Sequence, residues 1–229
     1  MGSCPRCRLP LTLVAGKYRF QRLIDEGNMG HIYLAHHIHL ASEPERVIKV
    51  MKPKVLSRPG MSERFMREVR LTAALSRRNE HVVQIYDDFG EEPKLGYYYV
   101  MEYLRGQSLK KLLRPGEALS RELIFHIFRQ LCQSIRAAHN EGVVHRDLKP
   151  ENIFLVRRGE DPFFVKVLDF GIAKPLKRAI HTDLTQGAIG TPDYMAPEQC
   201  LNVEVDSRCD IYAMGVILYE LFTGSTPFA

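Results

Sequence analysis

The chain has 229 residues, 45% of them apolar, which is enough to bury one large hydrophobic core or two smaller ones. Its 32 basic and 27 acidic residues are interspersed and leave a net charge of only +5, so composition does not indicate a nucleic-acid-binding surface. No apolar run reaches the roughly 20 residues of a membrane-spanning helix, and residues 1–16 lack the regions of a signal peptide, so we expect a soluble, cytoplasmic chain, although a longer parent protein could be membrane-anchored beyond residue 229.

The five cysteines are an odd number spread from Cys4 to Cys209, which indicates a reducing compartment and no disulfide framework. Cys4 and Cys7 have the spacing of half a zinc site. Structural zinc needs four ligands and no second such pair follows, so we interpret residues 1–16 as an N-terminal tail and do not expect zinc there.

The N-terminal half is predicted to be mainly β-sheet. Short or alternating apolar runs indicate strands, and apolar residues at spacings of three and four indicate one helix, on which Phe65 and Thr72 share a face. The expected helix is Ser62–Leu75, and the expected strands are Tyr18–Ile24, Ile32–Ala35, Val47–Met51, His81–Phe89 and Tyr97–Tyr103.

After Gly106 the pattern becomes mainly helical. Apolar residues follow a helical period over residues 120–140, with Ser120 as N-cap and Gly142 just past the end. A second apolar helix is expected over Ser207–Phe222. Between these helices the sequence predicts two strands, Ile153–Val156 and Phe163–Leu168, and a polar segment, Lys174–Tyr194.

Two glycines three residues apart, Gly27 and Gly30, separate the first two expected strands. Small residues at a turn let backbone amides approach phosphate oxygens, although ordinary hairpins have the same spacing. Lys49 is a lone charge in the apolar third strand, where a buried ammonium needs an anion. Glu68, on the expected helix, is the candidate partner, and the pair could hold nucleotide phosphates; the alternative is a solvent-facing lysine at a sheet edge.

The strongest functional signal is a polar segment in the C-terminal half. Phosphoryl transfer needs a group that orients the incoming hydroxyl, a cation that offsets phosphate charge, and oxygen ligands for magnesium. Asp147 can orient the hydroxyl, Lys149 can neutralise the phosphate, and Asn152 and Asp169 can ligate the metal; a polar loop without this function would have to match these offsets by chance. The segments are His145-Arg146-Asp147-Leu148-Lys149-Pro150-Glu151-Asn152 and Asp169-Phe170-Gly171.

In this order the motifs resemble the protein kinase family, and most closely the bacterial serine/threonine kinases of eukaryotic type. The resemblance runs from about Tyr18 to the end of the chain. It implies an α+β, two-lobed fold over residues 17–229: a β-rich N-lobe with one long helix at about 17–103 and a mainly helical C-lobe at about 104–229, without its last helices. It also implies ATP as cofactor, bound between the lobes with Mg²⁺, or with Mn²⁺ as an alternative.

The resemblance assigns roles to individual residues. The adenine base would pack on Ile24, Ile32, Val47 and Phe154, with Met101 as gatekeeper and the backbones of Glu102 and Leu104 bonded to its edge. The phosphates would be bound by Gly27, Gly30 and the pair of Lys49 with Glu68. Structural roles would belong to His145, Arg146, Phe170, Gly171, Glu198 and Asp210, with Asp210 holding the backbone of His145 and Arg146.

The substrate class also comes from the resemblance. Lys149, two residues after Asp147, and the segment Gly190–Glu198 resemble the serine/threonine group, with Thr191 expected to bond both Asp147 and Lys149. The expected function is therefore that of a non-specific serine/threonine protein kinase, which transfers the γ-phosphate of ATP to protein hydroxyls in signal transduction.

The polar segment before Gly190 contains candidate phosphorylation sites. A phosphate there would add about −1.5 to −2 charges and could pair with Arg146, which would order the loop. We predict autophosphorylation at Thr185 first and Thr182 second; the alternative is that both are ordinary loop residues.

The sequence departs from the family pattern in two places. Asp25 stands where the family usually has the first glycine of its phosphate-binding loop, and Asn28 stands at another frequent glycine position. A carboxylate pointing inward there would lower ATP affinity. The sequence also stops before several family helices that would cover Ile211–Phe222 and provide a partner for Glu198, so we expect the chain to be marginally stable, aggregation-prone or weakly active.

Two other functions stay open. A catalytically weak pseudokinase or scaffold is favoured by Asp25 and by the early end, and is disfavoured because all the polar groups of the reaction are present. A kinase that acts on a small molecule would share the metal chemistry but would leave Gly190–Glu198 unexplained.

Overall fold

The structure is a computed structural model that describes residues 9–10, 12–27, 29–40, 44–57, 59–170, 192–201 and 204–228. The chain divides into two compact units. The first comprises Met1–Ala74 and Gln84–Tyr103, and the second comprises Leu75–Val83 and Leu104–Ala229. In the described part of the chain, no helix is both long and apolar enough to span a membrane.

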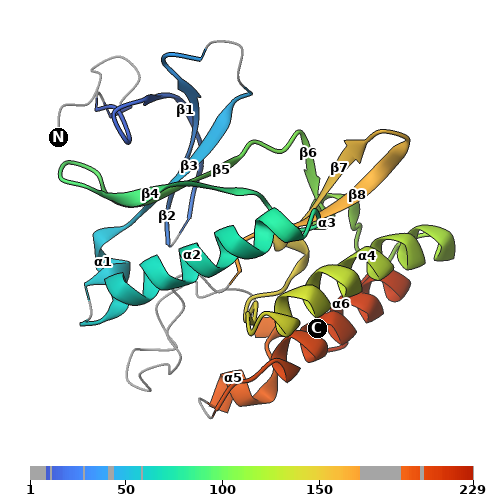
Figure 1. Ribbon diagram of the computed structural model, residues 1–229. Helices are drawn as coiled ribbons and strands as arrows, with labels where there is room; N and C mark the ends of the chain where they lie inside the picture. Colours follow the sequence, from blue (N-terminus) through green and yellow to red (C-terminus); the bar gives the residue numbers. More distant parts are fainter. Residues whose placement is uncertain are drawn as a thin grey trace. The chain divides into compact units, whose positions relative to one another are not determined.

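The first unit is built on a five-stranded antiparallel sheet with the strand order β1-β2-β3-β5-β4 (Figure 1). The register of β2 and β3 places Ile32 opposite Lys49. The predicted strands are confirmed in type and order. Their bounds are β1 (Tyr18–Glu26), β2 (Gly30–His37), β3 (Arg46–Met51), β4 (Ile85–Glu92) and β5 (Gly96–Glu102).

The fourth strand begins later than predicted. The sequence indicated His81 as its start, but residues 81–83 bond to the second unit's sheet instead. The backbone N–H of Val83 donates to Val167 O at 3.0 Å, and Val167 N–H donates to His81 O at 2.7 Å. A short apolar run can pair with a strand of either sheet, so the sequence does not indicate which sheet these residues join.

This part of the chain also contains α1 (Pro53–Leu56), which was not predicted, and α2 (Met61–Arg78). The face of α2 that the spacing predicted is buried at Phe65, Val69 and Thr72. The last turn of α2, from Leu75 onward, belongs to the second unit.

The core of the first unit includes residues that precede its first strand. Val14 is fully buried with Tyr18 and other apolar residues of the sheet. Leu9 and Ala15 pack against the same cluster, and the Ala15 N–H donates to Oε1 of Glu92 at 3.0 Å. The described part of the segment that we interpreted as a tail is therefore packed on the unit.

The second unit combines a three-stranded sheet with helices. The sheet has the order β6-β7-β8, and α4 and α6 lie side by side (Figure 1). The strands are β6 (Gly106–Ser108), β7 (Ile153–Arg158) and β8 (Asp161–Val167). The helices are α3 (Leu109–Leu112), α4 (Arg121–Asn140), α5 (Pro197–Leu201) and α6 (Arg208–Thr223), with short 3₁₀ turns η1 (Pro150–Asn152) and η2 (Pro192–Tyr194).

Helix α4 has the ends that the sequence predicted. The Leu123 N–H donates to the hydroxyl of Ser120 at 3.3 Å, so Ser120 is the N-cap. Past the other end, Gly142 has a φ of +71°, a conformation that glycine adopts without a steric penalty.

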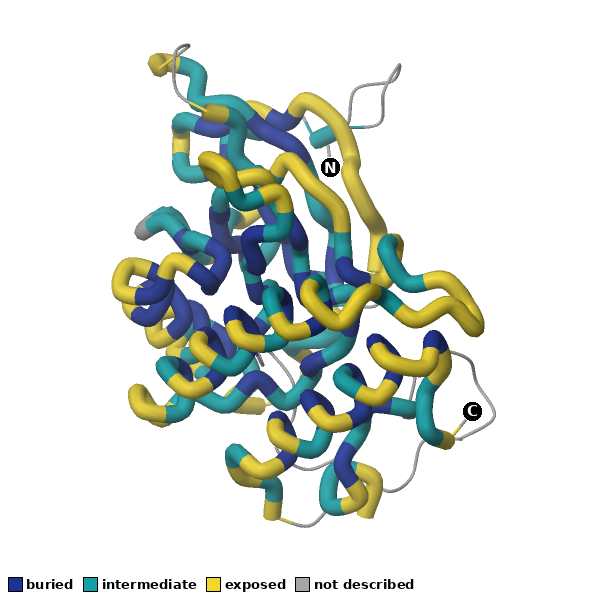
Figure 2. Tube along the Cα trace, turned by 90° about the vertical axis from the view of Figure 1, so that its right-hand side faces the viewer, coloured by how far each residue is buried: buried dark blue, intermediate teal, exposed yellow. Residues whose placement is uncertain are grey.

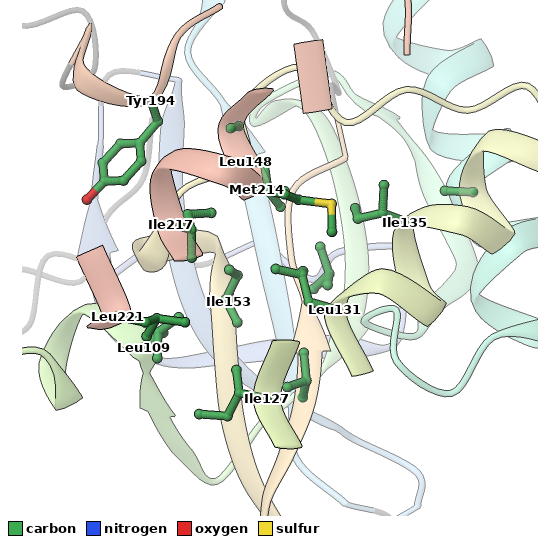
Figure 3. Packing of buried hydrophobic residues seen from close by; sticks show 14 of the residues in the cluster. Leu109, Ile127, Leu131, Ile135, Leu148, Ile153, Tyr194, Met214, Ile217 and Leu221 are labelled. Atoms are coloured by element: carbon green, nitrogen blue, oxygen red, sulfur yellow. The ribbon is translucent and has the colours of Figure 1, made fainter. Parts of the chain in front are cut away.

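One cluster of apolar side chains from α3, α4, β7 and α6 forms the core of the second unit (Figure 3). It holds Leu148 and Tyr194, which lie in the polar segments singled out by the sequence. Not all of α6 is covered: Ile211, Tyr219 and Phe222 are exposed along it, and Figure 2 shows helices on which buried and exposed positions alternate.

Candidate active site

The loop between α4 and η1 carries the polar residues of the second unit, and a carboxylate from α6 holds its backbone. Asp210 is only 1% exposed. Its Oδ2 accepts a hydrogen bond from His145 N–H and its Oδ1 accepts one from Arg146 N–H, both at 2.8 Å. The same Oδ2 lies 2.8 Å from Nε2 of His139, so the ring completes the set of contacts around the buried carboxylate.

Asp147 lies at the centre of this loop with Asn152 and Lys149. The Nδ2 of Asn152 donates to the backbone O of Asp147 at 2.8 Å and to its Oδ2 at 3.3 Å. The Nζ of Lys149 lies 3.8 Å from that Oδ2. A carboxylate with one fixed orientation and an adjacent ammonium can orient a hydroxyl and offset phosphate charge.

Two residues of this site have unusual backbone conformations. Arg146 has a φ of +61° and Asp169 has a φ of +54°, which non-glycine residues rarely adopt. The backbone O of Arg146 accepts a hydrogen bond from Nε2 of Gln199 at 2.9 Å, and the backbone N–H of Arg146 donates to Asp210. Tertiary contacts therefore stabilise a loop conformation that the local sequence disfavours.

Tyr194, from η2, lies beside the same loop. It is buried, and it lines a narrow cavity of about 10 Å³ together with Asp147 and Lys149. Its hydroxyl donates to Oε2 of Glu220 on α6 and points away from the other labelled core side chains in Figure 3. Burial, the hydrogen bond to Glu220 and the negative charges of Glu220, Glu151 and Asp193 raise the pKa of Tyr194, so the phenol stays protonated.

In the first unit, Gly27 and Gly30 differ in their surroundings. The Gly27 N–H donates to Gly30 O at 3.0 Å, and a Cβ on Gly27 would meet nothing within 4 Å. A Cβ on Gly30 would lie 2.1 Å from the carbonyl oxygen of Val50. Glycine at position 30 is therefore required by the close approach of β3.

Lys49 is buried in β3, at 7% exposure, and its Nζ lies 6.0 Å from the centroid of the Tyr99 ring. The alternative of a solvent-facing lysine is thus wrong. Glu68 has a contact that the sequence did not predict, because its Oε1 accepts a hydrogen bond from Nε of Arg64 at 2.8 Å, one helical turn away. The carboxylate of Glu68 is thereby held on α2.

The carboxylate of Asp25 makes a local hydrogen bond at the surface. It is exposed on β1, and its Oδ1 accepts a hydrogen bond from the following residue's N–H at 2.9 Å. The lower ATP affinity that we predicted from this residue stays a prediction.

The residues expected around adenine lie in both units. In the first unit, Val47 and Met101 are buried, Ile32 is partly buried and Ile24 is exposed. Glu102 is fixed at the end of β5, since its N–H donates to Gln84 O at 2.9 Å. In the second unit, Leu104 and Phe154 are partly buried.

Several predicted residues lie outside the described part of the chain. They are Cys4, Cys7, Gly171, Thr182, Thr185 and Thr191. Among the other structural candidates, His145 and Phe170 are buried with ring centroids 4.8 Å apart, and Glu198 lies in α5. Within the described ranges, no group of three or more histidine, cysteine, aspartate or glutamate side chains could hold a metal ion.

The sequence analysis missed three contacts of this site. His139 on Asp210, Tyr194 on Glu220 and Gln199 on the Arg146 backbone all join residues far apart in the chain. Only the position of Tyr194 in a polar segment could have drawn attention to it.

Residues 18–229 match the family model described as protein kinase domain. The chain is 40% identical over 213 residues to Serine/threonine-protein kinase Pkn1 of Myxococcus xanthus, covering 93% of this chain and 30% of Pkn1. It is 39% identical over 226 residues to Serine/threonine-protein kinase A of Synechocystis sp., covering 94% of this chain and 42% of that protein. The chain thus spans less than half the length of these curated relatives.

A solved structure gives the same assignment of fold. The crystal structure of the Mycobacterium tuberculosis PknI kinase domain superposes with a TM-score of 0.71 at 26% identity, covering 92% of this chain and 76% of that one. The predicted α+β kinase fold is confirmed.

Proposed function

The chain belongs to the protein kinase family, and from this membership we propose that it transfers the γ-phosphate of ATP to serine or threonine hydroxyls of protein substrates, in the cytoplasm. The observation that carries the proposal is the contact of Asp147 with Asn152 and Lys149 in one loop. The two curated relatives named above are serine/threonine-protein kinases by description, which supports the class of acceptor.

Each polar group has a distinct task in this proposal. Asp147 accepts a hydrogen bond from the incoming hydroxyl and orients it, and Lys149 offsets charge on the transferred phosphate. Lys49 binds the nucleotide phosphates, and Glu68 fixes the ammonium that does so. The proposal needs no covalent intermediate between the phosphoryl group and the protein, because positioning and charge neutralisation supply most of the catalysis in phosphoryl transfer.

The donor set fits a hard divalent cation. Asn152 is buried and donates through Nδ2, so its Oδ1 is the atom left to ligate a metal, and Asp169 adds a carboxylate. When bound, Mg²⁺ or Mn²⁺ neutralises the phosphate oxygens of ATP. Zinc is not part of the proposal.

Transfer of labelled γ-phosphate from ATP tests the function. The wild-type chain, Asp147→Asn and Asp206→Asn are compared with a protein acceptor and with small alcohols. Asp206 is an exposed aspartate paired with Arg208, so its variant controls for the loss of one charge. We expect transfer to protein only, lost in Asp147→Asn and kept in Asp206→Asn. Transfer to alcohols alone, or none by a folded sample, would refute the proposal.

We also propose autophosphorylation at Thr185 and then at Thr182. The proposal rests on the sequence, since both threonines lie outside the described residues. Phosphosite mapping after incubation with ATP and Mg²⁺, with Asp147→Asn as the inactive control, should find Thr185 modified in the wild type only. Absence of phosphate from both threonines in an active sample would contradict it.

A further inference from the structure

Glu220 is a buried charge for which the proposed reaction has no use. Among the described residues, the only buried carboxylates are Asp210, which holds the catalytic loop, and Glu220 on α6. A carboxylate removed from water is costly unless donors and a counter-ion face it. The contacts of Glu220 therefore need a functional or structural explanation.

Two groups of the described residues face the Glu220 carboxylate. The Tyr194 hydroxyl donates to Oε2, and the Nζ of Lys110 on α3 lies 3.4 Å from Oε1. The hydrogen bond from Tyr194 adds no positive charge, because the phenol is neutral. Lys110 is thus the counter-ion of this carboxylate among the described residues.

Lys110 and Glu220 differ in their exposure to solvent. The lysine side chain is 49% exposed, whereas that of Glu220 is 6% exposed. The ammonium therefore lies on the solvent side of the carboxylate, at the position that an external cation would occupy. Because half of the lysine is in water, it can be replaced without opening the core.

One residue, Tyr194, links this pair to the groups that would act on a substrate. Tyr194, the other partner of Glu220, shares its narrow cavity with Asp147 and Lys149. A second carboxylate acts on the same phenol. The negative charge of Glu151 raises the pKa of Tyr194, although burial and Glu220 raise it more. The Oε2 of Glu151 is buried and has no hydrogen-bond partner among the residues that the structure describes. Without Lys110, the two carboxylates that act on Tyr194 would have no cation facing them among the described residues.

We propose that Lys110 is a specificity-determining residue, which occupies the cation position at Glu220 and so excludes basic side chains of the protein substrate from it. Acceptor segments with a neutral or acidic side chain at that point are then preferred. The inference rests on the proposed function, because it concerns which protein segments the kinase domain accepts.

The test uses acceptor peptides in which a single Arg or Gln is moved through each position around the acceptor hydroxyl. The enzymes are the wild type, Lys110→Met and Lys111→Met, which removes the neighbouring exposed lysine of α3. We expect Lys110→Met to raise the Arg/Gln ratio of kcat/KM by at least about tenfold at one position, as for a charge-assisted contact. Lys111→Met should keep the wild-type ratio at every position.

Two further variants test whether the gain for Arg peptides comes from the pair of Lys110 and Glu220. Lys110→Arg keeps the positive charge and should keep the wild-type ratio. Lys110→Met combined with Glu220→Gln should lose the gain for Arg, because the carboxylate that binds it is gone. Equal ratios in Lys110→Met and Lys111→Met, or a gain that persists in the double variant, would overturn the inference.

Peptide affinity without ATP separates this inference from the proposed function. Fluorescence anisotropy of the same labelled peptides should show the tighter binding of the Arg peptide to Lys110→Met. If no enzyme transfers phosphate to any peptide, the proposed function fails, and the affinity ratio still decides whether Lys110 excludes basic side chains.

Discussion

Nε2 of His139, near the end of α4, lies 2.8 Å from Oδ2 of Asp210 on α6. The same carboxylate holds the backbone of His145 and Arg146, directly before Asp147. The imidazole thus contacts a carboxylate that in turn holds the backbone of the residues before Asp147, and in the proposed reaction His139 would be a positioning residue.

Replacement of His139 should lower the rate of phosphoryl transfer more than nucleotide binding. Loss of a hydrogen bond to a charged group costs about 1.5–3 kcal/mol, and we expect His139→Leu to lower kcat by about tenfold with a smaller change in KM for ATP. Steady-state kinetics measures both. His139→Gln, which can still donate, should recover part of kcat. The control is His126→Leu, since His126 lies on the same helix but contacts Asp161.

The two glycines of the first unit should respond differently to alanine. Gly30→Ala places a Cβ 2.1 Å from the Val50 carbonyl oxygen, so β2 and β3 must separate next to Lys49. We expect the free energy of unfolding to fall by about 1–3 kcal/mol, as measured by urea denaturation. A Cβ at position 27 would enter open space, so Gly27→Ala should change the free energy of unfolding by no more than about 0.5 kcal/mol. Equal losses in both variants would contradict this explanation.

The stability that Tyr194 contributes should depend on pH in the alkaline range. Its folded pKa is raised above the unfolded value of about 10. The contribution is thus fully present below about pH 10 and is lost as pH rises through the folded pKa. The difference in free energy of unfolding between wild type and Tyr194→Phe should be constant from about pH 7 to 9 and should shrink above about pH 10. If this difference in free energy of unfolding stayed constant above about pH 10, the pKa of Tyr194 would not be raised by folding.

The exposed apolar residues of α6 should promote self-association. Ile211, Tyr219 and Phe222 are exposed along one helix, and exposed apolar side chains favour contacts between molecules. Ile211→Glu should lower the fraction of aggregate in light scattering at high concentration. Leu71→Glu, at a single exposed leucine on α2, should not. A similar decrease in both would indicate a general effect of added charge.

Long periodic segments were the predictable part of the fold. Helix α4 and its Ser120 cap, and the five strands of the first sheet, follow from spacing and residue type alone. Helices α1 and α3 have four residues each, which is too short for a period to be recognised. The start of β4 was misplaced because its first residues pair with another sheet.

The candidate site also has residues that the sequence indicated and contacts that it did not. Asp147, Lys149 and Asn152 are close in sequence, so their residue types already indicated the chemistry. His139 and Asp210 are 71 positions apart, and a lone histidine in a helix has no pattern that points to its partner. Contacts between distant segments depend on how the helices pack, and residue types alone do not determine that.

The buried Val14 has a practical consequence for how the chain is cut. Its N–H and carbonyl exchange hydrogen bonds with Tyr18, and the next residue is tied to Glu92 on β4. A recombinant fragment trimmed to start at Tyr18, where the likeness to kinases begins, would delete these partners and open one side of the first unit to solvent. The expression boundary should therefore be chosen from packing rather than from homology, and should leave the residues from Leu9 in place.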